Sequence, residues 1–247
     1  MRALAQADYL VLWESGQELH PIDQGLLAVQ AAFPETRAER VADWPLGRRN
    51  HALARLYCAC FGPKVAGWTR CRQCGERLEF AADGQAMAQG DLEDSAVVVS
   101  ESGHSFRLPT SRDLAQIAAA ADAGAAAAQL LNLCRFSGEA DVGDTESAID
   151  AVQTLAWSDE EIERIGDRFA EADPLAEILL NFDCPACKQN FAEPLDLASF
   201  FWSALDARVR RLLADVHALA SAYGWSEAEI LALSSRRRNF YLKQVLA

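Results

Sequence analysis

The residues of this sequence best suited to chemistry are two pairs of cysteines, each with the spacing Cys-x-x-Cys. The first pair is Cys71 and Cys74, and the second is Cys184 and Cys187. One tight turn can offer both thiolates of such a pair to a tetrahedral ion, with Zn–S bonds of about 2.3 Å. A single pair is a weak signal because redox proteins share it, whereas two pairs supply the four ligands of a closed structural site. The sequence therefore predicts that these four cysteines hold one structural Zn²⁺.

The two pairs also have similar surroundings. When the sequence is aligned with itself at an offset of 113 residues (184 minus 71), the second pair falls on the first and Phe191 falls on Leu78. An apolar residue therefore follows each pair. A zinc ribbon made of two hairpins has this pattern. A closed set of four cysteines leaves no position for water, so we expect no hydrolytic metal chemistry. The negative charge of four thiolates around one Zn²⁺ can be offset by nearby cations, namely Arg70, Arg72, Arg77 and Lys188.

Three further cysteines leave alternatives open. Cys58 and Cys60 can complete a local site with Cys71 and Cys74. They fall on a predicted helix, where positions two apart point to different faces, so we expect them and Cys134 to be small core residues. A redox enzyme is another alternative, and it needs an accessible thiolate of low pKa. Neither Cys-x-x-Cys pair opens a helix after a buried strand, which argues against a thioredoxin-like site.

The sequence shows no catalytic set apart from the cysteines. Its four histidines are scattered, and His217 falls among apolar residues of a predicted long helix, where we expect it to be buried or at the boundary of the core. There is no phosphate-binding glycine loop and no Gly-x-Ser-x-Gly elbow. We therefore predict that the protein is not an enzyme.

Charge is unevenly distributed along the chain. The 247 residues include 23 basic and 36 acidic side chains, and the net charge of −13 argues against nucleic acid as the main partner. Residues 139–183 carry 14 acidic side chains against two arginines, whereas residues 44–78 carry seven basic side chains against one acidic. This separation predicts protein partners or an internal contact between the two segments, and the alternative is an acidic helix face that is simply solvated.

Hydropathy predicts a cytoplasmic protein. No stretch approaches the roughly 20 apolar residues that cross a bilayer. The apolar run from Tyr9 to Trp13 is too short for a signal peptide. Thiols stay reduced in the cytoplasm, and an odd number of cysteines arranged in pairs indicates metal ligands rather than disulfides.

The pattern of elements predicts an α+β fold that is predominantly helical, in which a central four-cysteine zinc ribbon is flanked by helical lobes. Helices are expected near residues 21–33, 46–61, 111–136 and 196–222, and a hairpin near 97–108. Ser158 with Glu161 predicts a capping box on the second of two acidic helices, and Ser226 with Glu229 predicts another. The expected segments are a helical one (1–63), half of the ribbon with a hairpin (64–109), a helical insertion (110–174, acidic from 139), the other half of the ribbon (175–195) and a C-terminal helical one (196–247).

The C-terminal motif carries a family resemblance. Tyr223 to Leu233, followed by Arg236-Arg237-Arg238 and Tyr241-Leu242, resembles the baseplate hub and assembly proteins of T-even-like contractile phages. Most of the chain is more similar still to their relatives in extracellular contractile injection systems. That similarity rests on Trp13-Glu14, His20 to Asp23, Gly47 to Arg49, Phe61 to Pro63, the knuckle from Cys71 to Glu79, Arg107 to Thr110 and the second knuckle at Cys184. The resemblance is weakest over residues 138–171, and Lys188 replaces the glycine expected after the second knuckle.

The resemblance implies a structural or assembly component of a baseplate. Its partners would be hub, spike or wedge subunits, with no nucleic acid, and it would be cytoplasmic during assembly or lie in the baseplate of the mature particle. Aromatic and Arg side chains are enriched at interface hot spots, so the predicted docking residues are Trp225, Arg236, Arg237, Arg238 and Tyr241. In the alternative arrangement, Trp225 packs on the long helix and the arginines are solvated. The alternative function is a cytosolic zinc-ribbon regulator or adaptor that binds nucleic acid through residues 48–77.

Overall fold

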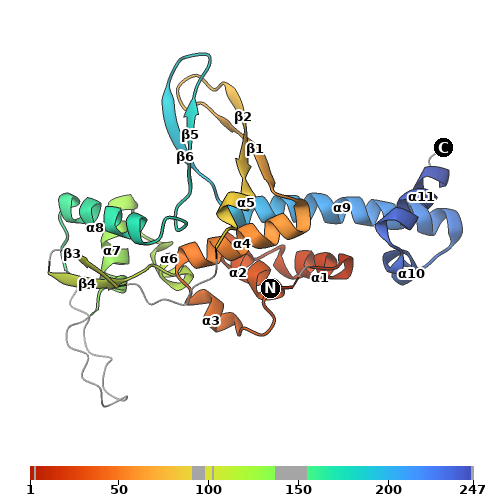
Figure 1. Ribbon diagram of the computed structural model, residues 1–247, viewed down its shortest axis with the longest axis horizontal. Coiled ribbons are helices and arrows are strands. Elements are labelled where there is room, and N and C mark those ends of the chain that lie inside the picture. Colours follow the sequence, from red (N-terminus) through yellow and green to blue (C-terminus); the bar gives the residue numbers. More distant parts are fainter. Residues whose placement is uncertain (3, 91–97, 102, 137–154, 246–247) are drawn as a thin grey trace.

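One long helix, α9 (Leu197–Tyr223), runs from the centre of the molecule toward its C-terminal end (Figure 1). The computed structural model describes residues 1–2, 4–90, 98–101, 103–136 and 155–245. Helices dominate these ranges, and the strands form three separate two-stranded antiparallel sheets. The prediction of a mostly helical α+β fold is confirmed at this level.

The main core surrounds the first half of α9. Asp196 caps this helix by accepting hydrogen bonds from the amides of Ala198 and Ser199. Its inward side chains recur every three or four positions, as an amphipathic helix requires. They pack against α1 (Gln6–Gly16), α2 (Pro21–Ala32) and α4 (Leu46–Phe61), with the short α3 (Ala38–Ala42) beside them. The first and last segments of the chain therefore share one core.

Two hairpins project together from this body (Figure 1). The first pairs β1 (Lys64–Arg70) with β2 (Arg77–Asp83), and the short α5 (Gly84–Met87) follows it. The second pairs β5 (Leu179–Asp183) with β6 (Asn190–Pro194). Each Cys-x-x-Cys pair lies in the turn between the two strands of a hairpin. Neither pair therefore opens a helix, in agreement with the sequence.

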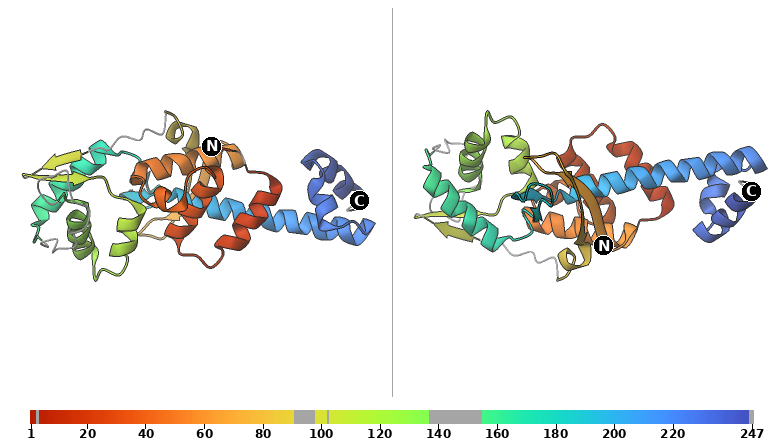
Figure 2. Two further views of the ribbon diagram at one scale, coloured as in Figure 1. Left: turned by 90° about the horizontal axis from the view of Figure 1, so that it is seen from below. Right: turned by 90° about the horizontal axis from the view of Figure 1, so that it is seen from above.

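A second lobe lies at the end of the molecule opposite the C-terminus (Figure 2). In it, β3 (Val98–Glu101), β4 (His104–Arg107), α7 (Ala123–Cys134) and α8 (Asp159–Ala172) surround a small core, and α6 (Ser111–Ile117) packs on α7. Ser158 and Glu161 form the predicted capping box of α8. The first of the two predicted acidic helices lies outside the described residues.

The chain ends in two short helices, α10 (Glu227–Ala232) and α11 (Ser235–Val245), which fold back on the end of α9. Gly224 ends α9 with a φ of +69°, a left-handed conformation that glycine adopts without steric cost. Leu219 and Ile230 are fully buried where α9 meets α10. None of the helices within the described ranges combines the length and apolar character of a membrane span.

Candidate metal centre

The four predicted ligand cysteines meet at the tip of the paired hairpins. The Sγ atoms of Cys71 and Cys187 are 3.5 Å apart, those of Cys74 and Cys184 are 3.6 Å apart, and all four lie within 4.8 Å of one another. A tetrahedron with Zn–S bonds of about 2.3 Å has S···S edges of about 3.8 Å. The sulfur positions therefore match a four-thiolate ion site in which each hairpin supplies two ligands.

The two knuckles have the same backbone geometry. The amide of Gly75 donates to the Cys71 carbonyl at 2.8 Å, and the amide of Lys188 donates to the Cys184 carbonyl at 2.9 Å. The φ angles of Gly75 and Lys188 are +76° and +63°. Lys188 therefore forms the same turn as the glycine that it replaces, and only the side chain differs.

Backbone amides also point at the sulfurs. A backbone hydrogen bond from Cys74 lowers the pKa of the Cys71 thiol to about 7. The bond from Glu76 lowers the pKa of Cys74 as well, but burial and the neighbouring thiols outweigh it and raise that pKa to about 12. At Cys187, the backbone hydrogen bond from Gln189 lowers the pKa of the thiol, but burial and the neighbouring thiols of Cys71 and Cys184 outweigh it and raise that pKa. Four sulfurs this close need a cation before all of them can be ionised.

The cations near the knuckles have defined partners. Arg72 donates from Nε and Nη2 to the two carboxylate oxygens of Glu193, at 2.8 and 3.0 Å. This pair joins the turn of the first hairpin to a strand of the second and lowers the pKa of Glu193. The guanidinium groups of Arg70 and Arg77 lie 5.5 and 5.0 Å from the centre of the Trp68 ring. Arg72 is thus the cation that links the two halves of the site.

An aromatic cluster packs between the cysteine centre and helix α9. The rings of Phe182 and Phe191 stack at 5.4 Å, and Phe80 contacts Phe182 at 5.8 Å and Phe200 of α9 at 5.7 Å. Leu78 joins the same cluster, so the apolar residues that follow the two knuckles pack in one cluster. Phe80 and Phe200 are members of the site that were not predicted from the sequence. The alternation of apolar residues along β2 was the available signal for Phe80.

The other cysteines lie elsewhere. Among the described residues, the group that can hold an ion contains only Cys71, Cys74, Cys184 and Cys187. Cys58 and Cys60 lie on α4, so the alternative local site is not what the structure assembles. Burial raises the pKa of both thiols. Cys134 is buried, as expected, and burial raises its pKa to about 12.

The predicted docking residues of the C-terminal segment divide into two groups. Trp225 stacks on Tyr223 at 4.7 Å and contacts Tyr241 edge to face at 5.0 Å, so it packs back on the end of α9. Arg238 is only 4% exposed, and its guanidinium donates to Asp215 at 3.2 Å and to Gln6. The prediction that Arg238 is presented at the surface is therefore wrong, because partners on α9 and α1 bury it.

The remaining members of this segment, Arg236 and Arg237, are exposed. The histidine prediction also needs correction. His217 is exposed, because Val216 and Leu219 occupy the inward face of α9 instead. His51 on α4 is the buried histidine, at 5% exposure.

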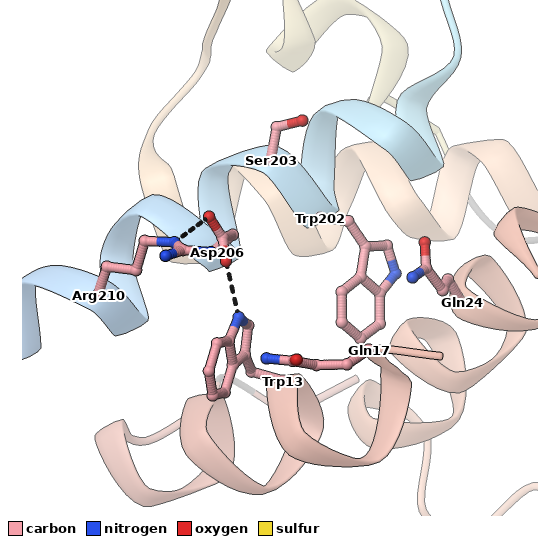
Figure 3. Close-up of a pocket in the computed structure, with 7 residues that line it drawn as sticks. All are labelled: Trp13, Gln17, Gln24, Trp202, Ser203, Asp206 and Arg210. Atoms are coloured by element: carbon pink, nitrogen blue, oxygen red, sulfur yellow. Dashed lines mark hydrogen bonds and ion pairs between the residues drawn. The ribbon is translucent and has the colours of Figure 1, made fainter. Parts of the chain in front are cut away.

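A polar pocket of about 380 Å³ opens between α1, α2 and α9 (Figure 3). Asp206 lines it and accepts hydrogen bonds from Trp13 Nε1 at 2.9 Å and from Arg210 Nε at 2.7 Å. The remaining lining residues are Gln17, Gln24, Trp202 and Ser203. The carboxylate is thus already engaged by its neighbours, and the side chains lining this pocket hold no paired nucleophile and base.

The chemistry that the described residues support best is therefore metal binding by four thiolates. All four ligand positions of a tetrahedron are supplied by protein, which is the arrangement of a structural rather than a catalytic ion. Comparison of the chain with protein-family models, with curated proteins and with solved structures finds no match.

Proposed function

We propose that the protein is a non-enzymatic structural or assembly component of the baseplate of a contractile phage tail-like injection system, built around one structural Zn²⁺. The observation that supports the metal is the convergence of four cysteine sulfurs from two hairpins. The baseplate assignment rests on the resemblance carried by the knuckles and by the segment from Tyr223 to Leu242. The protein acts through contacts with hub, spike or wedge subunits.

The zinc would join parts of the chain that are far apart in sequence. Cys74 and Cys184 are 110 residues apart, and the second lobe is inserted between them. Cross-linking a long loop lowers the entropy of the unfolded chain, and a tetrathiolate ion contributes folding free energy directly. The ion therefore holds the two hairpins face to face on the helical body. It also closes the chain that contains the second lobe into a loop, which restricts how far that lobe can move from the body.

Elemental analysis of the purified protein tests the metal. We expect one zinc per chain in the wild type and loss of zinc in Cys184→Ser. Cys58→Ser is the matched control, because it removes a thiol outside the cluster. Iron in place of zinc, or a metal-free protein of unchanged stability, would overturn the assignment.

A pull-down of the tagged protein from its native host tests the assembly role. Mass spectrometry of assembled particles and of the soluble fraction should find baseplate subunits with the protein. Recovery in particles indicates a resident subunit, and recovery with the same subunits only in the soluble fraction indicates an assembly factor. Recovery without any baseplate subunit would contradict the proposal.

One observation favours the second candidate, a nucleic-acid-binding regulator. Trp68 is 52% exposed on β1, with the guanidinium groups of Arg70 and Arg77 beside its ring. Exposed aromatic rings flanked by cations can stack on single-stranded bases. Titration of a single-stranded oligonucleotide at increasing salt separates the two candidates, because the regulator requires salt-sensitive binding that Trp68→Ala abolishes.

A further inference from the structure

Two helices at opposite ends of the elongated molecule carry opposite charges (Figure 2). Helix α8 has six acidic residues and two arginines, a net charge of −4. Helix α11 has three arginines, one lysine and no acidic residue, a net charge of +4. Because the helices lie at opposite ends, they cannot meet within one copy in this arrangement.

The outward face of α11 presents an aromatic ring among cations. Phe240 is 62% exposed, the largest exposure among the exposed aromatic side chains of the described residues. Arg236 lies four positions before it and Lys243 three positions after it, so all three share one side of the helix. Arg238 points the other way and is buried. An exposed aromatic with neighbouring arginines has the composition of an interface anchor.

The outward face of α8 presents acidic side chains beside small residues. Ile165 is fully buried against the lobe, and Glu163, Gly166, Asp167 and Ala170 are exposed on one outer flank. A side chain added at Gly166 would meet nothing within 4 Å, so the space above it is open.

The two arginines of α8 lie on its other flank. They approach Glu101 at 3.7 Å from Arg164 and 3.9 Å from Arg168. The outer flank with the small residues therefore keeps its negative charge and has room for a large ring.

We propose that the α11 face of one copy docks on the α8 face of a second copy. In this contact Phe240 packs over Gly166 and Ala170, while Arg236 and Lys243 approach Glu163 and Asp167. The two faces differ, so the contact is heterologous and repeats head to tail into a ring or an open chain. This inference goes beyond the baseplate proposal and does not depend on it.

Charge selects this orientation over others. The net charge of −13 opposes the approach of two copies in most orientations, whereas the head-to-tail one brings the three exposed cations of α11 (Arg236, Arg237 and Lys243) against the acidic flank of α8. Two short helices form a small contact, so we expect weak, concentration-dependent association that salt reduces.

Sedimentation velocity of the full-length, metal-loaded protein tests the proposal. At low salt, the wild type should form species larger than a dimer as its concentration rises. An α11 variant, Arg236→Gln with Phe240→Ala, and an α8 variant, Glu163→Gln with Asp167→Asn, should each be monomeric. Glu14→Gln with Glu18→Gln is the matched control, because it removes two exposed acidic charges, one on α1 and one in the turn after it, and should leave association unchanged.

Mixing the two variants gives the sharpest result. Each variant retains one intact face, so an equal mixture should form dimers and nothing larger. All substituted side chains are exposed, and circular dichroism should show unchanged helix content. A wild type that stays monomeric at every concentration would overturn the proposal, as would association that survives in both variants or a mixture that forms no dimer.

Discussion

Lys188 adopts the left-handed backbone conformation that Gly75 adopts at the equivalent position of the other knuckle, with φ angles of +63° and +76°. Among the described residues, Lys188 is the one non-glycine residue with a positive φ. The hydrogen bond from its amide to the Cys184 carbonyl requires this turn, and the turn brings both sulfurs of the pair to one side. The turn of the second knuckle thus requires a backbone conformation at Lys188 that is unfavourable for a residue with a side chain.

Replacing Lys188 by glycine should therefore stabilise the metal-loaded protein. Relief of the left-handed strain contributes about 1 kcal/mol, and the greater freedom of glycine in the unfolded chain offsets part of it. Urea unfolding of Lys188→Gly and wild type measures the difference. Gly75→Ala should shift stability in the opposite direction, and equal effects of the two substitutions would contradict the argument.

Removing the metal should unfold the hairpins before the helical body. Incubation with a strong chelator is expected to lower the melting temperature clearly and to expose Cys71 and Cys184, which are now 2% and 1% exposed. Differential scanning fluorimetry and thiol alkylation followed by mass spectrometry measure both effects. Cys58→Ser should behave as wild type, and a melting temperature unaffected by chelation would rule out a structural ion.

Acid should weaken the second lobe through Asp113. Burial alone would raise the pKa of Asp113, but hydrogen bonds from Arg107 and Thr110 outweigh it and lower the pKa. The folded state therefore favours the carboxylate, and this stability is present above the unfolded pKa of about 4 and is lost as pH falls through the folded pKa. Hydrogen exchange of residues 98–136 followed from neutral to acid pH measures it.

Asp113→Asn is the variant that isolates this effect. It should cost about 2 kcal/mol at neutral pH, because Arg107 loses its charged partner while staying partly in contact with water. It should also flatten the acid dependence of the lobe. Glu160→Gln, at an exposed position of α8 outside the proposed docking face, is the control and should change neither. An unchanged acid profile in Asp113→Asn would refute the assignment.

Two helical glycines should respond in opposite directions to alanine. A Cβ at Gly16 would lie 2.0 Å from the Trp202 ring, whereas a Cβ at Gly166 meets nothing within 4 Å. Gly16→Ala should therefore destabilise by about 1–3 kcal/mol through overpacking. Gly166→Ala should stabilise by up to about 1 kcal/mol through helix propensity. Thermal unfolding of both variants decides the matter, and a stable Gly16→Ala protein would show that the contact yields easily.

Local signals explain which parts of the fold the sequence could predict. Helix α4 has the predicted bounds of residues 46 and 61, and the caps at Ser158 and Ser226 lie where the sequence pattern predicts them. The four ligands were also predictable, because their spacing repeats. Such features depend on residues a few positions apart.

Features that depend on distant contacts were missed or misjudged. Helix α1 was not delimited, because its apolar residues are consecutive and include the 63% exposed Val11. Arg238 is buried by a contact with Gln6, 232 residues away in sequence. His217 sits among apolar neighbours but faces solvent. No local pattern carries this information.

The separation of the two knuckles also constrains the order of events during synthesis. The first hairpin leaves the ribosome with two thiolates and no complementary pair until residue 187 has been made, and α1, α2 and α4 likewise wait for α9. The metal site must therefore remain incomplete while more than a hundred further residues are translated. Completion of the protein, rather than emergence of its first segments, is the moment at which the metal can be enclosed.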